Sequence, residues 1–278
     1  PNGRRLAFEC LSRVDETASD RLVPQMLQDP SREFRRDAVA RAIDEAKALH
    51  NQNKKEEAIE AYRRALSGAV DDDQVKLIVQ PLGRLGVTVD LPRHFGFLTE
   101  WHLIGPFDNR KGIGFKASYP PEESVDLGTT YEGQLGEVKW TPLSTDDNYG
   151  LVDIAKKIEN YKGSVMYAYT TFDAEGDREV EIGLGTPNAG TLGGNGERLF
   201  GREEYHRGFA MDQFRVKARF RSGENAILLK ICQDENDQDW AQRYQFELRV
   251  CDQAGAAVLP RASEKTADAR KTGAGAGE

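Results

Sequence analysis

The spacing of apolar residues changes character near Val87. From residue 4 to about residue 86, apolar residues recur every three or four positions, which predicts amphipathic helices. Beyond Val87 they fall into short β-branched and aromatic runs separated by Gly, Pro, Asn and Asp, a pattern typical of an antiparallel sandwich. We therefore expect an α+β multidomain chain with helices over 1–90, a β-sandwich over 91–258 and a flexible tail over 259–278.

The predicted helices are separated by recognisable start and stop signals. Asp29-Pro30-Ser31 interrupts the helical pattern, and Ser31 is placed to cap a helix that continues through Ala48. Asp71 to Asp73 begin a further helix, which Gly86 ends. The first predicted apolar stripe consists of Leu6, Cys10, Leu11 and Val14, and the second of Leu22, Met26 and Leu27.

Two stretches of the helical segment resemble known repeats. DPSREFRRDAVARA, with the helices before it, resembles a HEAT repeat, and AIDEAKALHNQNKKEEAIEAYRRALSGAVDDDQV is similar to a tetratricopeptide unit. Such repeats bury their apolar faces only against neighbours. The resemblance therefore implies contact with proteins and a removed array in front of Pro1; packing of the helices on the sandwich is the alternative.

The sandwich pattern predicts nine strands and several features of their connections. Gly105-Pro106 is expected to end the first strand, Pro120-Pro121 to form an extended segment at the sheet edge, and residues 186–194 to form a mobile glycine-rich loop. A loop near Gln238 is expected to join the last two strands as a hairpin. The predicted strands are 99–104, 138–142, 152–154, 164–173, 178–184, 197–200, 212–220, 225–233 and 244–252.

Three further motifs carry a resemblance for the sandwich itself. They are WHLIGPFDNRKGIGFKASYPPEE, EIGLGTPNAGTLGGNGERLF with its Asn-Gly turn, and FRSGENAILLKICQ. Together they resemble a galactose-binding-like, sugar-binding jelly-roll module found in large extracytoplasmic bacterial proteins, notably of planctomycetes. The resemblance spans residues 101–255 and implies recognition without a reaction, in a periplasmic or secreted protein.

Composition and motifs argue against several other functions. A net charge of −8 disfavours nucleic acid, which is bound mainly through clustered Lys and Arg. No apolar run approaches the ~20 residues of a membrane span. The four histidines and three cysteines lack the spacing of a zinc site, and no Gly-x-Ser-x-Gly motif occurs. We therefore expect free thiols, no metal, no cofactor and no enzyme activity.

The acidic loop DENDQDW is interpreted as a solvated hairpin loop, with calcium binding as the alternative.

The predicted binding residues lie in sandwich loops, where aromatic faces and planar polar groups can hold a sugar. The alternative is that Arg207 and Asp212 form an internal ion pair and that Trp240 caps the core. The candidates are Asn195, Tyr205, His206, Arg207, Asp212 and Trp240.

Three functions follow from these observations. The leading hypothesis is a module that binds carbohydrate or a cell-envelope partner through the sandwich loops. The second is a structural or protein-interaction scaffold within a larger assembly. The third is a hydrolase, which would require two carboxylates facing each other in a cleft.

Overall fold

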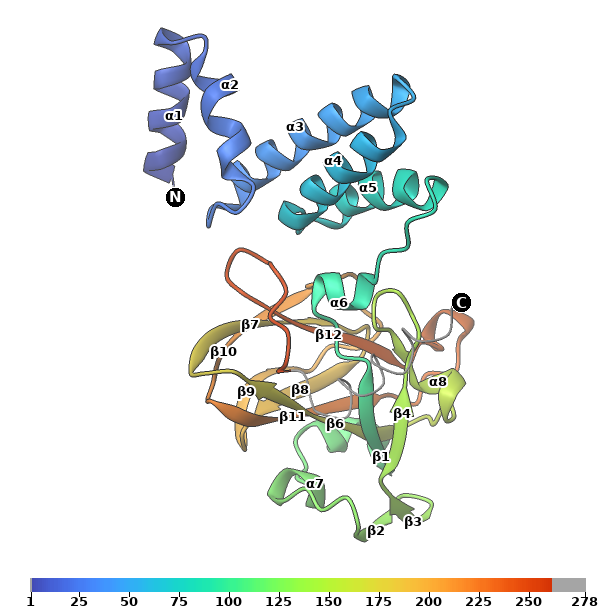
Figure 1. The fold of residues 1–278 in the computed structure, drawn as a ribbon. Coiled ribbons are helices and arrows are strands. Elements are labelled where there is room, and N and C mark those ends of the chain that lie inside the picture. Colours follow the sequence, from blue (N-terminus) through green and yellow to red (C-terminus); the bar gives the residue numbers. More distant parts are fainter. Residues whose placement is uncertain (1, 262–278) are drawn as a thin grey trace. The chain divides into compact units, whose positions relative to one another are not determined.

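The computed structural model describes residues 2–261, which divide into two compact units (Figure 1). Among the described residues, one unit comprises 2–96 with 251–257, and the other comprises 97–250 with 258–261. Helices followed by an antiparallel β-sandwich confirm the predicted fold class. Beyond Arg261, the tail predicted over 259–278 lies outside the described residues.

The helical unit is built from five α-helices and a short 3₁₀ helix, followed by the short helix α6. Ser31 is the N-cap of the long helix α3, and Gly86 adopts φ +87° just past the end of α5, as their sequence signals predicted. The helices are α1 (Asn2–Val14), α2 (Ala18–Leu22), η1 (Val23–Met26), α3 (Arg32–Asn51), α4 (Lys55–Gly68), α5 (Asp72–Arg84) and α6 (Leu91–Phe95).

Helices α3 and α4 pack along their length through small residues. Ala42 and Ala46 of α3 and Ala58 and Ala65 of α4 are all buried, which lets the two backbones approach closely. Tyr62 of α4 is buried as well, and its ring meets that of His50 edge-on at 6.3 Å.

In contrast to the contact between α3 and α4, the apolar stripe predicted on the first helix is mostly exposed. Leu6 is 62% exposed and Val14 is 83% exposed, so the stripe of α1 is largely uncovered by the described chain. The thiol of Cys10 on the same helix is also exposed. An uncovered apolar stripe on a helix that is otherwise polar is a candidate contact surface.

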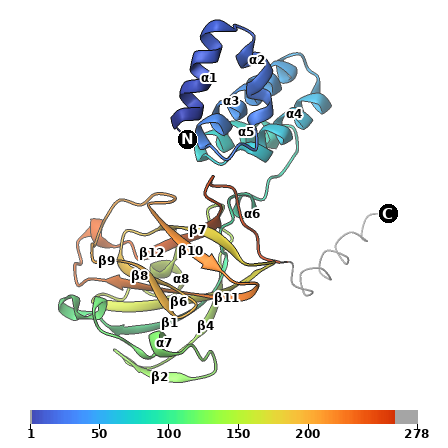
Figure 2. The same ribbon diagram turned by 90° about the vertical axis from the view of Figure 1, so that its left-hand side faces the viewer.

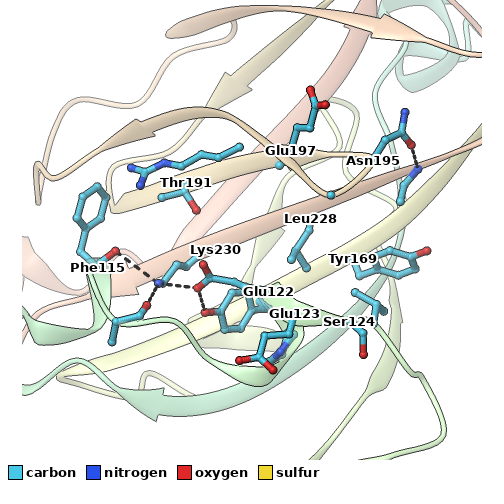
Figure 3. Close-up of a pocket in the computed structure, with 18 of the residues that line it drawn as sticks. Phe115, Glu122, Glu123, Ser124, Tyr169, Thr191, Asn195, Glu197, Leu228 and Lys230 are labelled. Atoms are coloured by element: carbon cyan, nitrogen blue, oxygen red, sulfur yellow. Dashed lines mark hydrogen bonds and ion pairs between the residues drawn. The ribbon is translucent and has the colours of Figure 1, made fainter.

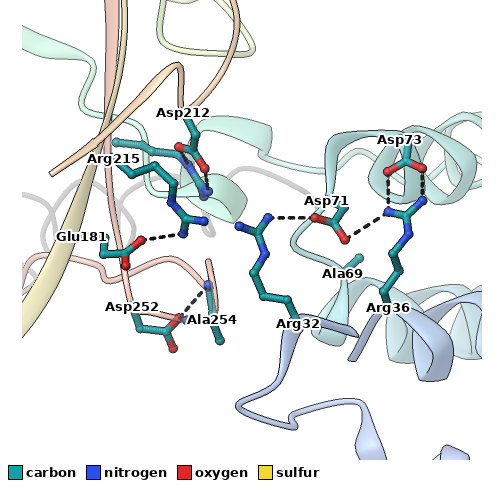
Figure 4. A network of polar contacts seen from close by, with 12 residues as sticks. Arg32, Arg36, Ala69, Asp71, Asp73, Glu181, Asp212, Arg215, Asp252 and Ala254 are labelled. Atoms are coloured by element: carbon teal, nitrogen blue, oxygen red, sulfur yellow. Dashed lines mark hydrogen bonds and ion pairs between the residues drawn. The ribbon is translucent and has the colours of Figure 1, made fainter. Parts of the chain in front are cut away.

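Ion pairs connect the start of α3 to the start of α5. Figure 4 shows the guanidinium of Arg36 between Asp71 and Asp73, with Arg32 donating to the other oxygen of Asp71 at 2.9 Å. The two carboxylates raise the pKa of Arg36 and Arg36 lowers the pKa of Asp73. Because both side chains of the Arg36–Asp73 pair are about half exposed or more, this pair contributes little to the stability of the fold.

The second unit is a sandwich of a six-stranded and a four-stranded antiparallel sheet, seen as stacked layers in Figure 2. The six-stranded sheet has the order β4-β1-β6-β11-β8-β9, and the four-stranded sheet has the order β10-β7-β12-β5. A separate hairpin consists of β2 (Thr130–Gly133) and β3 (Gly136–Lys139). The sandwich strands are β1 (Glu100–Asp108), β4 (Thr141–Ser144), β5 (Val152–Asp153), β6 (Ser164–Ala174), β7 (Arg178–Gly185), β8 (Ala189–Gly194), β9 (Glu197–Arg202), β10 (Phe214–Phe220), β11 (Gly223–Gln233) and β12 (Gln245–Cys251).

The facing surfaces of the two sheets form one apolar core. Trp101 of β1 is 2% exposed and meets Phe246 of β12 edge-on at 5.0 Å, which joins the two layers. Phe172 of β6 and Phe220 of β10 also join the layers, with their rings 5.0 Å apart and tilted by 44°. The predicted alternation in β10 is confirmed, since its apolar side chains are more buried than its basic ones.

Two predictions about strand connections are wrong. Strands β11 and β12 do not form a hairpin: β11 pairs with β6 and β8 in one sheet, whereas β12 lies between β7 and β5 in the other. Both strands are apolar because they are buried, and a strand in either sheet of a sandwich can be buried in the core. Strand β1 also continues through Gly105-Pro106 to Asp108, because a register shift between Ile104 and Phe107 accommodates the proline.

The extended segment predicted at Pro120-Pro121 and the mobile loop predicted over 186–194 are both wrong. Pro120-Pro121 begins a single helical turn, α7 (Pro120–Glu123), because proline is well suited to the first helical positions. The glycine-rich stretch that was predicted to be mobile forms β8, which pairs with β11 on one side and with β9 on the other. Glycine permits the close approach of neighbouring backbone in this strand.

The remaining elements of the sandwich are short. They are η2 (Arg110–Phe115), α8 (Ile154–Lys157) and η3 (Asp239–Ala241). Cys232 and Cys251 are buried and form no disulfide. No helix in the described part of the chain is long and apolar enough to cross a membrane.

Candidate functional site

A cavity of about 390 Å³ lies on the outer face of the six-stranded sheet, and we call it the sheet-face cavity (Figure 3). Its floor comes from β6, β11 and β8, and one wall is the segment 115–125. The strand registers explain the floor: Tyr167 of β6 and Thr191 of β8 both pair with Lys230 of β11. Alternation along each strand then brings Tyr169 and Leu228 to the same face, while Ile231 and Leu229 point into the core.

Lys230 stands at the centre of the floor and is 2% exposed. Its ammonium donates to Oε1 of Glu122 at 2.8 Å and to the carbonyl oxygens of Ala117 at 2.6 Å and Phe115 at 3.4 Å. A buried ammonium is costly unless its protons are all accepted, and here three acceptors are present. All three belong to the segment 115–122, so Lys230 ties the wall of the cavity to the sheet (Figure 3).

Aromatic side chains complete the surroundings of Lys230. The rings of Tyr119 and Tyr167 lie 5.7 and 5.8 Å from its nitrogen, within cation–π range. The hydroxyl of Tyr167 also donates to Oε1 of Glu122. Burial, followed by this hydrogen bond to a carboxylate, raises the pKa of Tyr167 far above that of a free tyrosine. Glu122 is therefore held by both an ammonium and a phenol.

The two ends of the cavity each present an aromatic ring. Figure 3 shows Phe115 at one end and Tyr169 at the other, with Lys230 and Leu228 between them. The guanidinium of Arg198 lies 5.5 Å from the centre of the Phe115 ring. The Tyr169 ring rests against that of Trp140 at 6.1 Å. Both end residues are half-buried and line the cavity.

Asn195 is the one predicted site residue that lines this cavity. It forms the β8–β9 turn with Gly196, and both have positive φ, +51° and +81°, as an Asn-Gly hairpin turn requires. Its side chain donates to Oδ1 of Asn225 and accepts from the amide of Ala226, each at 2.9 Å. The predicted hairpin turn is therefore confirmed, and it is held rigidly at the rim of the cavity.

Three other predicted residues form a separate surface cluster. Nε2 of His206 lies 2.8 Å from Oδ2 of Asp234, and the His206 ring meets that of Trp240 edge-on at 5.0 Å. Trp240 is 64% exposed, so the alternative that it caps the core is wrong. Tyr205 lies beside His206 and accepts from Asn109; burial raises its pKa to about 12.

The remaining two predicted residues are engaged in ion pairs. Arg207 pairs with Glu204 at 2.5 Å, and Asp212 pairs with the fully buried Arg249 at 2.6 and 2.7 Å. The expected alternative, a pair between Arg207 and Asp212, is therefore wrong, because each has a different partner. Figure 4 includes Asp212 and the neighbouring Glu181–Arg215 pair on the same sheet.

Lys230, Glu122 and Tyr167 were not among the predicted site residues. A signal for Lys230 was present, because it is the only charged residue in the apolar run AILLKIC of a predicted central strand. Its partner Glu122 lies in a segment with no periodic pattern, so nothing local indicates the pairing. In the described part of the chain, no group of three or more His, Cys, Asp or Glu side chains could hold a metal ion.

Neither a protein-family model nor a curated protein sequence matches the chain. Solved structures with some similarity include a GH2 β-galacturonidase from Eisenbergiella tayi (TM-score 0.33, 11% identity, 56% of this chain and 25% of that one). Others are a β-glucosidase from Kluyveromyces marxianus in complex with glucose (0.33, 12%, 62% and 18%) and a β-glucuronidase from Ruminococcus gnavus in complex with D-glucaro-d-lactam (0.31, 13%, 55% and 29%). The chain thus spans less than a third of each of these proteins, and likeness at this level assigns it neither family nor activity.

Proposed function

We propose that the β-sandwich binds a carbohydrate in the sheet-face cavity and carries out no reaction on it. The observation that carries the proposal is the pair of half-buried rings, Phe115 and Tyr169, at opposite ends of a cavity with polar side chains between them. A sugar ring has apolar C–H faces that stack on aromatic rings and a hydroxyl edge that needs donors and acceptors. A volume of about 390 Å³ is within the range of small-molecule sites.

The charges of the lining favour a neutral ligand. Lys230 and Glu122 neutralise each other within the wall. At the rim, the cations Lys116 and Arg198 are balanced by the carboxylates of Glu123 and Glu197. Such a balance provides no strong field to attract a phosphate or polyanion, whereas it provides both donors and acceptors for hydroxyl groups.

A binding role without catalysis also fits the arrangement of carboxylates. Glycoside hydrolysis needs two carboxyl groups facing each other across the bond, about 5 to 10 Å apart. Glu122 is occupied by Lys230 and Tyr167, and the carboxylates of Glu123 and Glu197 point away from each other in Figure 3. We place this binding module outside the cytoplasm, on the strength of the sequence resemblance.

Isothermal titration calorimetry against a panel of neutral mono- and oligosaccharides tests the proposal. We expect Phe115→Ala and Tyr169→Ala each to weaken binding about tenfold. Trp240→Ala is the matched control, since it removes an exposed aromatic ring outside the cavity. Absence of binding to every sugar of the panel, or release of reducing ends from a bound sugar, would contradict the proposal. Loss of binding in Trp240→Ala alone would place the site at the surface cluster of Tyr205, His206 and Trp240.

A scaffold role is the second candidate, and the uncovered stripe of α1 favours it. In that case the double variant Leu6→Ser and Val14→Ser would abolish assembly with a protein partner, while the cavity variants would leave assembly intact. Native mass spectrometry of the assembly purified from its source distinguishes the two candidates.

A further inference from the structure

A second hollow of about 380 Å³ opens beside the sheet-face cavity, and we call it the edge hollow. Asn195 and Glu197 line both spaces, so the two adjoin at the tip of the β8–β9 hairpin. In Figure 3 these two residues stand at the rim of the sheet-face cavity. The edge hollow is lined by Asp177, Gly194, Asn195, Glu197, Leu199, Ala218, Arg219, Phe220 and Arg221.

The edge hollow is lined by residues from an edge strand of each sheet, β9 and β10. Strand β9 is the last strand of one sheet and β10 is the first strand of the other. The rings of Phe200 and Phe214, 4.9 Å apart, close the space between these edges at one end. At the hairpin end, Leu199 and Ala218 are smaller, and the space stays open to solvent.

The rim of the edge hollow offers hydrogen-bonding groups of both kinds. Among residues 2–261, the guanidinium of Arg221 has no carboxylate partner. Arg219 reaches only Asp177, at 4.0 Å, with both side chains well exposed, so that pair is weak. The positive charges of Arg219 and Arg221 are balanced by the carboxylates of Asp177 and Glu197, so the lining of the edge hollow has no net charge. Such a lining again suits the hydroxyl groups of a neutral sugar.

We propose that the two hollows form one extended groove that holds a neutral oligosaccharide, with one sugar in the sheet-face cavity and the next in the edge hollow. This inference rests on the proposed function. The turn residue Asn195 is then the point over which the glycosidic linkage passes. Its hydrogen bonds to Asn225 and Ala226 keep this point in place without ligand, which lowers the cost of ordering on binding.

Calorimetry with a chain-length series tests the groove. For the monosaccharide with the best affinity and its own di- and tetrasaccharides, we expect affinity to rise about tenfold or more from one unit to four. Arg221→Ala, which changes only the edge hollow, should weaken the tetrasaccharide several-fold and leave the monosaccharide unchanged. Lys217→Ala is the matched control, because Lys217 is an exposed cation on β10, the strand that ends just before Arg221, and lines neither hollow.

The outcomes separate the two proposals. Equal affinity for all lengths, or equal weakening of monosaccharide and tetrasaccharide by Arg221→Ala, would overturn the extended groove and leave the sheet-face cavity as a single-sugar site. Absence of binding at every length would overturn carbohydrate recognition itself, and the groove with it.

Discussion

The ammonium of Lys230 lies 2.8 Å from Oε1 of Glu122, and this contact joins a central strand to a segment that has no strand partner of its own. Lys230 is nearly fully buried, whereas the side chain of Glu122 is 32% exposed. The pair is therefore asymmetric. Loss of Glu122 would leave a buried cation with only carbonyl partners, and loss of Lys230 would leave a carboxylate that water can reach.

Replacing Lys230 tests the role of this contact. Lys230→Met should lower the free energy of unfolding by about 2 to 3 kcal/mol, because it removes the cation from Glu122, which keeps Tyr167 as a donor, and leaves the carbonyls of Phe115 and Ala117 without their side-chain donor. Urea denaturation measures the loss, and hydrogen exchange should show faster exchange over 115–123. Lys116→Met is the control: its side chain is 81% exposed and only 3.9 Å from Glu203, so it should change stability by less than ~0.5 kcal/mol. Equal stability of the two variants would contradict the role of Lys230.

The buried tyrosines predict a loss of stability at high pH. Burial raises the pKa of Tyr205 to about 12 and that of Tyr167 further, whereas a free tyrosine titrates near 10. Above pH 10 the unfolded chain releases these protons while the folded chain retains them. The unfolded state then binds fewer protons, and the free energy of unfolding falls by ~1.4 kcal/mol per pH unit for each such tyrosine.

Variants identify the residues responsible for this pH dependence. Tyr205→Phe should reduce the slope of stability against pH between about 10 and 12, and Tyr167→Phe should reduce it across the whole alkaline range. Urea titrations at successive pH values measure both slopes. Slopes in the two variants that match the unchanged protein would show that other groups cause the alkaline loss.

Two glycines of β8 provide a matched pair. A Cβ at Gly190 would overlap the carbonyl oxygen of Lys230 on the neighbouring strand, and backbone cannot move aside easily. At Gly193 the nearest atom would be 3.5 Å away, an ordinary contact. Gly190→Ala should cost about 3 kcal/mol or prevent folding, and Gly193→Ala should lie within ~1 kcal/mol of the unchanged protein. Thermal unfolding by circular dichroism measures both, and similar midpoints would exclude a close approach at Gly190.

The cysteines should differ in reactivity. Cys10 is exposed on α1, whereas Cys232 and Cys251 are buried, and burial raises the pKa of Cys232 to about 12. Since the thiolate is the reactive form, one thiol per native chain should react rapidly with an aromatic disulfide reagent, and three should react after unfolding. Cys10→Ser should remove the rapid phase. A rapid phase that survives this substitution would place the reactive thiol in the sandwich.

Strands with a strong local pattern could be predicted from the sequence. β6, β10 and β11 alternate or are continuously apolar, and their predicted bounds agree with the structure within two residues. β8 could not be predicted, because Ala-Gly-Thr-Leu-Gly-Gly has little intrinsic strand preference and its pairing depends on neighbours far along the chain.

At the candidate site, too, only the feature with a local sequence signal could be predicted. Asn195 was predicted because the Asn-Gly turn is a local signal with a known geometry. The contact of Lys230 with Glu122 is not local, and only the fold brings a helical turn at Pro120 onto the middle of β11. The connection of β11 to β12 across the layers was missed for a related reason, since hydrophobic pattern gives burial but not the identity of the sheet.

Strands β1 and β12 are the first and last strands of the second unit, yet their side chains meet in its core, and this has a consequence for synthesis on the ribosome. Trp101 emerges at the start of the sandwich, yet the ring that covers it, Phe246, belongs to the last strand. At elongation rates of ~5–20 residues per second, Phe246 is synthesised roughly 7 to 30 s after Trp101. A nascent sandwich therefore exposes its largest core side chain until translation of the domain is nearly complete.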